Sequence, residues 1–471
     1  MNIKRKLNAA LAALAAAAVV AALSGCLKTS ADELYRLPRS SDEYFRLQKR
    51  IDAVLASGAE YSPPTSGENR QSVQLEDIDG DGVKEAIAFF AARSEDYPLK
   101  IYIFKSDGDD YITADIIEGV GAGIESIRYT DMDGDGFLEL VVGWQMGASL
   151  KNMALYLERG FQHVKVAEAD YSTLLVSDIT GDGAPDVSVV RLGTAEAPGE
   201  LEVFSLMADG EIVGASAHLS DGVESVSRAQ AGQLSDGVPV VVIDGKAAGG
   251  GLVTDMFCSV DGALVNIARA SAAGVDPVET EPRTLTVYST DIDRDGVVEI
   301  PYPVPLPRQS DTVYYSIEWR AYASDGSRAV SMSTYHNYSD GWYLILPDAW
   351  RGGITVRRAD AVYGERIMVF SFVDGEQSEV SATTNGATNG ATSATSNASG
   401  GAVDFLKIYT LSGENREERA RLPGRFRLLE EGDKIYAAEL YPIVQQRPDA
   451  PDEIAVKESF RRIYSDWLMG A

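Results

Sequence analysis

The sequence predicts a mainly β protein: a propeller-like array of about five four-stranded sheets, joined by acidic loops and followed by a C-terminal α+β domain. Three observations predict this fold class. A nine-residue acidic loop occurs four times, short runs typical of strands flank each copy, and the copies start at residues 77, 131, 178 and 291. A period of roughly 50 residues that holds about four strands is that of a propeller blade, and such units stack to bury both faces of each sheet.

Each acidic loop has oxygen-bearing side chains at its positions 1, 3, 5 and 9 and Gly at position 6. These residues are Asp77, Asp79, Asp81 and Glu85; Asp131, Asp133, Asp135 and Glu139; Asp178, Thr180, Asp182 and Asp186; and Asp291, Asp293, Asp295 and Glu299. Calcium prefers six to eight oxygen ligands, and Gly permits the sharp bend that brings them together. An Asp-Gly hairpin turn is the alternative interpretation, but it needs only one such pair. The loops therefore predict structural Ca²⁺ at up to four sites, with the third weakened by Thr180.

The flanking runs are rich in β-branched and aromatic residues and predict a strand on each side of each loop. They are Ser72–Leu75, Ser126–Tyr129, Thr173–Val176 and Thr284–Tyr288 before the loops, and Ala86–Phe90, Leu140–Val142, Val187–Val190 and Ile300–Tyr302 after them. The long gap between the third and fourth loops contains Gly232–Val240, which keeps Asp-Gly but has lost the other ligands. We therefore expect five units over 68–335, with Tyr315–Arg320 as an inner strand of the fifth and the fourth unit free of metal.

The first residues predict a targeting segment that takes no part in the fold. Residues 1–26 have a basic start and an apolar run, and they end in Leu23-Ser-Gly-Cys26, which resembles the bacterial lipobox. A transmembrane anchor is the alternative, but the apolar run is shorter than the ~20 residues that span a bilayer. We expect lipidation at Cys26, which would anchor the chain to the outer face of the cytoplasmic membrane. Residues 27–67 predict a tether and an amphipathic helix over Ser41–Leu55.

The acidic loops at this spacing resemble the FG-GAP or VCBS repeats of integrin-type propellers and bacterial surface proteins. Together with the lipobox, the chain resembles VCBS-repeat lipoproteins of Gram-positive gut bacteria. The resemblance implies calcium binding by the carboxylates of the first, second and fourth loops. Two features depart from that family: the unit around Asp236 lacks ligands, and five units are fewer than the seven blades such propellers commonly have.

Residues 336–471 predict a separate α+β domain. Its expected strands include Gly341–Trp350, Ile354–Arg357, Arg366–Phe372, Phe405–Tyr409 and Tyr436–Leu440, and its expected helix is Asp452–Met469. The stretch 381–402 has almost no large apolar residue, and it predicts a disordered insertion between strands.

Composition restricts the function. The formal net charge of −29 disfavours binding to nucleic acid. The three histidines lack zinc-binding spacing, and Cys258 lies among apolar residues, as a buried thiol would. The sequence predicts a non-enzymatic binding scaffold for a protein or glycan partner; the alternative is a polysaccharide hydrolase or lyase built on the propeller. Six aromatic residues are candidates for ligand stacking, although core packing is the simpler interpretation: Trp144, Trp319, Trp342, Trp350, Tyr335 and Tyr338.

Overall fold

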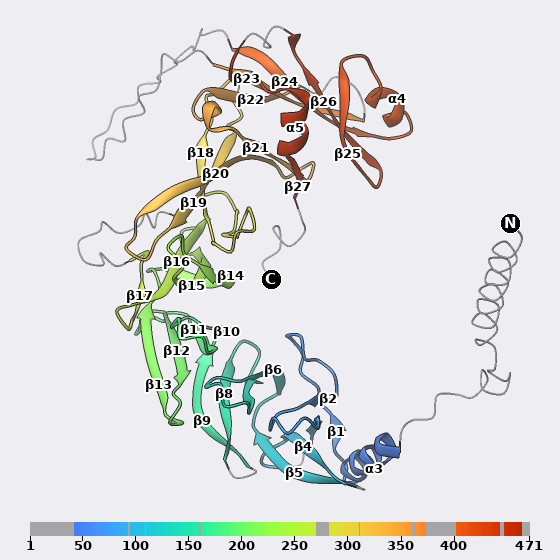
Figure 1. Ribbon diagram of the computed structural model, residues 1–471, viewed down its shortest axis with the longest axis vertical. Coiled ribbons are helices and arrows are strands. Elements are labelled where there is room, and N and C mark those ends of the chain that lie inside the picture. The colour runs from blue at the N-terminus through green and yellow to red at the C-terminus, as the bar shows by residue number, and fades with distance from the viewer. Residues whose placement is uncertain are drawn as a thin grey trace, which may run out of the picture. The chain divides into compact units, whose positions relative to one another are not determined.

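The computed structural model describes residues 42–92, 95–108, 110–159, 162–269, 282–309, 311–359, 364–373, 402–442 and 447–463. The predicted signal segment with Cys26 lies outside these residues, as do the tether up to residue 41 and the predicted insertion up to residue 401. The described chain is mainly β and contains several four-stranded antiparallel sheets (Figure 1). Among the described residues, no helix has the length and apolar character needed to cross a bilayer.

The chain divides into two compact units, of which the first comprises the described residues up to Pro63, Gln71–Asp77 and Asp81–Gly119. Its elements are α3 (Asp42–Ala56), β1 (Glu60–Tyr61), β2 (Val73–Glu76), β3 (Glu85–Ala91), β4 (Leu99–Asp107) and β5 (Asp110–Gly119). The predicted amphipathic helix is confirmed. Leu47 and Ile51, one turn apart on α3, are buried in one core with Ala88 and Phe90 of β3.

The second unit begins with three antiparallel sheets, and each is a meander of four strands that follow one another along the chain (Figure 1). The first contains β6 (Gly123–Thr130), β7 (Glu139–Gln145), β8 (Lys151–Arg159) and β9 (Gln162–Tyr171). The next contains β10 (Thr173–Ser177), β11 (Asp186–Arg191), β12 (Glu200–Leu206) and β13 (Ile212–His218). The third contains β14 (Val223–Gln233), β15 (Pro239–Ala247), β16 (Leu252–Val260) and β17 (Ala263–Asn266).

These sheets pack face to face, and the alternation of side chains along a strand shows how. On β11, Val187 and Val189 point into a core shared with the preceding sheet, whereas Val190 lies in a core shared with the following sheet. Val241 and Val242 on β15 divide in the same way between two cores. Successive side chains on a strand face opposite sides, so a strand between two sheets is apolar throughout. That arrangement explains the continuous apolar runs after each loop.

The fifth sheet differs from the prediction at both ends. Its strands are β18 (Ile300–Pro305), β19 (Tyr315–Tyr322), β20 (Arg328–Asn337), β21 (Trp342–Leu346) and β27 (Phe460–Arg462). The predicted strand Thr284–Tyr288 is wrong, because the amide of Val287 bonds to the carbonyl of Leu285 in a tight turn, and only single bridges flank it. The assignment of residues 341–350 to a second sheet is also wrong: β21 pairs with β20 and belongs to the fifth sheet.

A sixth sheet has the strand order β22-β23-β24-β26-β25. Its strands are β22 (Ile354–Arg358), β23 (Glu365–Phe372), β24 (Val403–Ser412), β25 (Arg425–Glu431) and β26 (Lys434–Leu440), accompanied by η3 (Asp348–Trp350), α4 (Arg416–Ala420) and α5 (Glu453–Ser459). Phe372 pairs with Val403, so the described segments that precede and follow the predicted insertion form adjacent strands. This sheet shares its largest core with the fifth sheet, through residues such as Trp342 and Phe370.

The predicted helix Asp452–Met469 is correct only over its first turns. Asp452 caps α5, with its Oδ1 accepting from the amide of Ala455 at 2.8 Å. The helix ends at Ser459, because Phe460 turns into a strand that pairs with Leu344 of β21 and buries its ring against Trp342. Residues 464–469 of the predicted helix lie outside the described residues.

Candidate metal centres

All four acidic loops adopt the same local conformation. In each, the backbone amide at position 6 donates to the carboxylate at position 1, at 3.0, 3.2, 2.9 and 2.9 Å in chain order. The glycine at position 6 has a φ of 85°, 90°, 93° and 93°, a region that L side chains rarely adopt. The amide at position 7 donates to the carboxylate at position 5 in every loop, at 2.8 to 2.9 Å. The sequence repeat therefore corresponds to a structural repeat at atomic detail.

Position 4 also requires a positive φ, a feature that the sequence reasoning missed. Gly80, Gly134 and Gly181 have φ values of 66°, 75° and 80°, and Arg294 has a φ of 69° at the same position of the fourth loop. Glycine at position 4 of the first three loops was the available signal. Arg294 is therefore held in a strained backbone conformation.

Position 2 is apolar in every loop and anchors the loop to the core, another feature that sequence reasoning missed. Met132 is 1 % exposed and Ile292 is 7 % exposed. Their backbone amides donate to the position-9 glutamates, Met132 to Glu139 Oε2 at 2.7 Å and Ile292 to Glu299 Oε2 at 3.1 Å. The buried side chain at position 2 thus fixes the amide that orients the position-9 carboxylate.

Three of the four predicted sites bring carboxylates together. In each group, the carboxylate oxygens lie within 4.8 Å of one another: Asp77, Asp79 and Glu85; Asp131, Asp133 and Glu139; and Asp291, Asp293 and Asp295. Asp81, Asp135 and Glu299 belong to the same loops but lie outside these groups. Asp81 also accepts from Lys105 Nζ at 3.0 Å, which lowers its pKa. Hard oxygen donors clustered in this way suit calcium.

The third loop does not form such a group within the described part of the chain. Asp186 Oδ2 accepts from the amides of Ile179 and Thr180, at 3.0 and 3.1 Å, and from the Thr180 hydroxyl at 3.1 Å. Its other oxygen, Oδ1, accepts from the hydroxyl of Ser205 on β12. Asp178 and Asp182 cap the loop amides as their counterparts do. The protein itself therefore satisfies the position-9 carboxylate in this loop.

The fourth unit carries a shorter turn over residues 234–238. Asp236 Oδ2 accepts from the amide and hydroxyl of Ser324, at 2.9 and 2.6 Å, and these hydrogen bonds lower its pKa despite partial burial. No group of metal-ligating side chains forms at this turn among the described residues. At this turn, Asp236 thus binds the segment around Ser324 directly through hydrogen bonds.

The electrostatics of the second and fourth loops favour a bound cation. Burial, followed by repulsion from neighbouring aspartates, raises the pKa of Glu139 to about 7 and that of Glu299 to about 7. Burial also raises the pKa of Asp133 and Asp293. Oε1 of Glu299 is enclosed without a hydrogen-bond partner. A buried carboxylate oxygen without a donor is costly, and a divalent cation is a group that would compensate it.

The other residues considered for binding or catalysis belong mainly to the core. Trp144, Trp319, Trp342, Trp350 and Tyr335 are at most 4 % exposed, which supports the core interpretation, whereas Tyr338 is 37 % exposed. Cys258 is fully buried, and burial raises the pKa of its thiol to about 11. Burial lowers the pKa of His336 to about 3.

Residues 77–142 match the FG-GAP-like repeat family. The matched range starts at the first residue of the first acidic loop and ends in β7, just after the second loop, so it covers one loop-to-loop repeat. No curated protein sequence matches the chain. The repeat and the sheets together define a repeat-containing, β-rich protein of the extracellular type.

Proposed function

We propose that this chain is a calcium-binding surface protein, anchored by a lipid on Cys26 to the outer face of the cytoplasmic membrane, that acts as a non-enzymatic binding scaffold. Its sheets are the blades of a propeller-like array, and the sixth sheet with α4 and α5 is a C-terminal α+β part. The partner is a protein or a glycan.

The observation that carries this proposal is the enclosed carboxylate at position 9. Glu139 and Glu299 are 4 % and 0 % exposed, and isolated buried carboxylates are strongly disfavoured unless paired or coordinated. In the second loop, Asp131 and Asp133 supply further oxygens beside Glu139. Calcium bound there would join the two strands that flank the loop and would stabilise the folded state by mass action.

A calcium titration of the metal-free protein tests the proposal. We expect binding at the first, second and fourth loops, tighter for Ca²⁺ than for Mg²⁺ because Mg²⁺ retains its water shell and demands octahedral geometry. Asp131→Asn should remove one site, whereas Asp236→Asn, the matched control at the turn without ligands, should leave the number of sites unchanged. Isothermal titration that detects no calcium binding, or an equal loss in both variants, would contradict the proposal.

Membrane attachment is tested separately. Mass spectrometry of the mature N-terminus should find a lipid on Cys26, and Cys26→Ala should move the protein from the membrane fraction to the soluble fraction. A wild-type chain that is recovered unlipidated from the medium would reject the anchor and leave the calcium sites untouched.

A further inference from the structure

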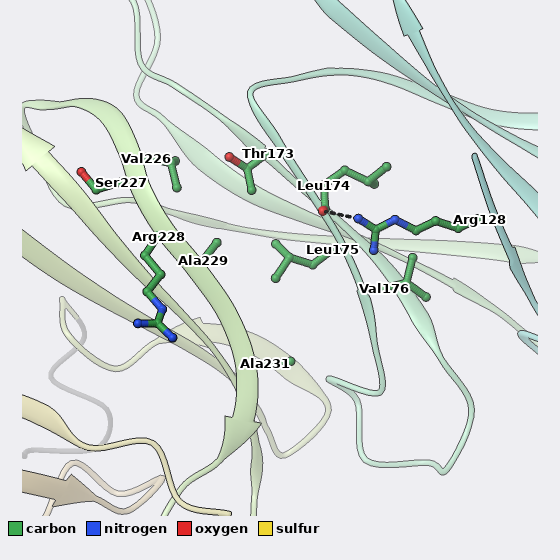
Figure 2. A pocket seen from close by; sticks show the side chains of 10 residues that line it. All are labelled: Arg128, Thr173, Leu174, Leu175, Val176, Val226, Ser227, Arg228, Ala229 and Ala231. Carbon is green, nitrogen blue, oxygen red and sulfur yellow. Dashed lines mark hydrogen bonds between the residues drawn. The ribbon is translucent and has the colours of Figure 1, made fainter. Parts of the chain in front are cut away.

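A cavity of about 390 Å³ lies among the first strands of three successive sheets in the second unit (Figure 2). Arg128 comes from β6, Thr173 and Leu175 from β10, and Ser227 and Arg228 from β14. None of its ten lining residues is acidic, although the whole chain has a formal charge of −29. The lining combines two guanidinium groups and two hydroxyls with an apolar wall of leucine, valine and alanine side chains.

The two arginines are not neutralised by the protein. Neither forms an ion pair with a carboxylate among the described residues, in contrast to Arg191, which pairs with Glu200 on the adjacent strand, and Arg320, which pairs with Glu318 on its own strand. Arg128 makes one hydrogen bond, to the carbonyl of Leu174 at the long distance of 3.5 Å (Figure 2). A guanidinium has five N–H donors, so most of the donors of Arg128 are available to a ligand.

A β-bulge helps to place the second arginine. The pairing of β14 with β15 shifts register between Val226 and Arg228, so Ser227 is the extra residue. Val226, Ser227 and Arg228 are all among the residues that line the cavity, so the bulge lies at its wall. Bulges redirect side chains and are common next to functional sites.

We propose that this cavity binds a small oxyanion, with Arg128 and Arg228 as its counter-charges. The guanidinium fork matches the geometry of carboxylate and phosphate groups, and the absence of acidic lining residues removes competition for it. The volume lies near the lower end of the range of about 300–1,000 Å³ typical of ligand pockets, which suits a ligand of monosaccharide size. The inference rests on the binding role proposed above and gives it a ligand class, but it does not depend on calcium.

Calorimetry on the calcium-saturated full-length chain tests the proposal with three probes: glucuronate, inorganic phosphate and uncharged glucose. We expect at least one oxyanion to bind and glucose to bind at least about tenfold more weakly, because charge-assisted hydrogen bonds are the stronger ones. Binding of glucuronate alone identifies a sugar acid as the ligand, and binding of phosphate alone identifies a free inorganic anion; either supports the site.

Variants locate the binding. Arg128→Gln and Arg228→Gln should each weaken oxyanion binding about tenfold or more, while Arg70→Gln, an exposed arginine outside the cavity, should leave it unchanged. Arg128→Lys keeps the charge without the fork and should fall between wild type and Arg128→Gln. Equal affinity for glucuronate and glucose, no binding of either oxyanion by the wild type, or unchanged binding in the double Gln variant would overturn the proposal. Failure here with intact calcium binding would leave the proposed scaffold standing.

Discussion

The second and third acidic loops have nearly the same backbone conformation, but the carboxylates at position 9 have opposite surroundings. Asp131 and Asp178, at position 1, each accept backbone amides from positions 4 and 6. At position 9, Glu139 accepts one amide and joins a carboxylate group, whereas the shorter Asp186 is surrounded by donors, including Thr180. Asp186 is one methylene shorter than Glu139, and Thr180 adds a hydroxyl donor beside it. Protein donors therefore occupy the carboxylate of Asp186, whereas the carboxylate of Glu139 keeps an arrangement that suits a cation.

The fourth unit extends this contrast. It has no acidic loop site, but a buried ion pair joins Asp244 of β15 to Arg283 at 2.8 Å, with side-chain exposures of 1 % and 8 %. Ser289 donates to Asp244 from its amide at 2.6 Å and from its hydroxyl at 2.9 Å. These contacts tie the segment before the fourth loop to the third sheet of the second unit. Under the proposed function, some repeats bind an external cation, whereas the fourth unit supplies its own counter-charge. This contrast makes four predictions.

The largest effect is expected at the internal ion pair. Arg283→Ala leaves Asp244 buried without its partner and should lower the free energy of unfolding by about 3–5 kcal/mol. Because no calcium is involved, the loss should be the same with and without calcium in chemical denaturation. Arg421→Ala, which removes an exposed pair with Glu417, should cost less than about 1 kcal/mol. If the loss of unfolding free energy in Arg283→Ala disappeared when calcium was added, the ion pair would not act independently of calcium, and the contrast between the two kinds of repeat would fail.

The second prediction concerns how stability depends on pH through the second and fourth acidic loops. In the metal-free protein, the pKa of Glu139 and of Glu299 is about 7 against an ordinary value of 4.5. The folded state therefore holds these protons more tightly than the unfolded chain does, and the associated stability is present below pH 4.5 and lost as the pH rises through 7. The loss should reach about 3 kcal/mol per glutamate.

Denaturation of the metal-free protein between pH 4.5 and 8 measures this loss. Glu139→Gln with Glu299→Gln removes both titrating groups and should flatten the profile. Saturating calcium favours the ionised carboxylates and should reverse the trend, so that the gain in stability from calcium grows with pH. A metal-free profile that rises over this range would contradict the electrostatic argument.

The third prediction tests the third acidic loop, where protein donors occupy the carboxylate of Asp186. Asp186→Ala removes an acceptor shared by two backbone amides and two hydroxyls and should destabilise the protein by about 2 kcal/mol, with or without calcium. Asp182→Ala, at an exposed position of the same loop, should have a smaller effect. If Asp186→Ala instead removed a calcium site, the third loop would belong with the second.

The smallest effect is expected at Arg294, which has a positive φ where the other loops have glycine. Arg294→Gly should stabilise the protein by about 1 kcal/mol, because glycine adopts this conformation without steric strain. Arg294→Ala removes the same side chain but keeps a Cβ, and should give no such gain in a thermal melt. Equal stabilisation by both variants would show that the side chain, and not the backbone, is responsible.

The sequence predicts the strands around the first three loops well because their signals are local. The apolar runs in β7 and β11 and the ligand spacing in each loop are both read within about ten residues. The roles of loop positions 2 and 4 were missed although their signals are local, whereas two other missed features depend on contacts between distant segments. Ser205 reaches Asp186 from another strand, and Arg283 reaches Asp244 across a sheet. Neither contact has a local pattern, so the different behaviour of the third loop could not be predicted from Thr180 alone.

The pairing of β27 with β21 has a consequence for the order of folding. Phe460, Arg461 and Arg462 complete the outer edge of a sheet whose other four strands all come earlier in the chain, and Phe460 adds its ring to the core around Trp342. During synthesis, that edge of β21 stays unpaired until the strands of the sixth sheet have been made. β27 therefore covers the edge of β21 only late in folding. Removal of residues 460–462 should expose β21 as a free edge prone to pairing with other chains.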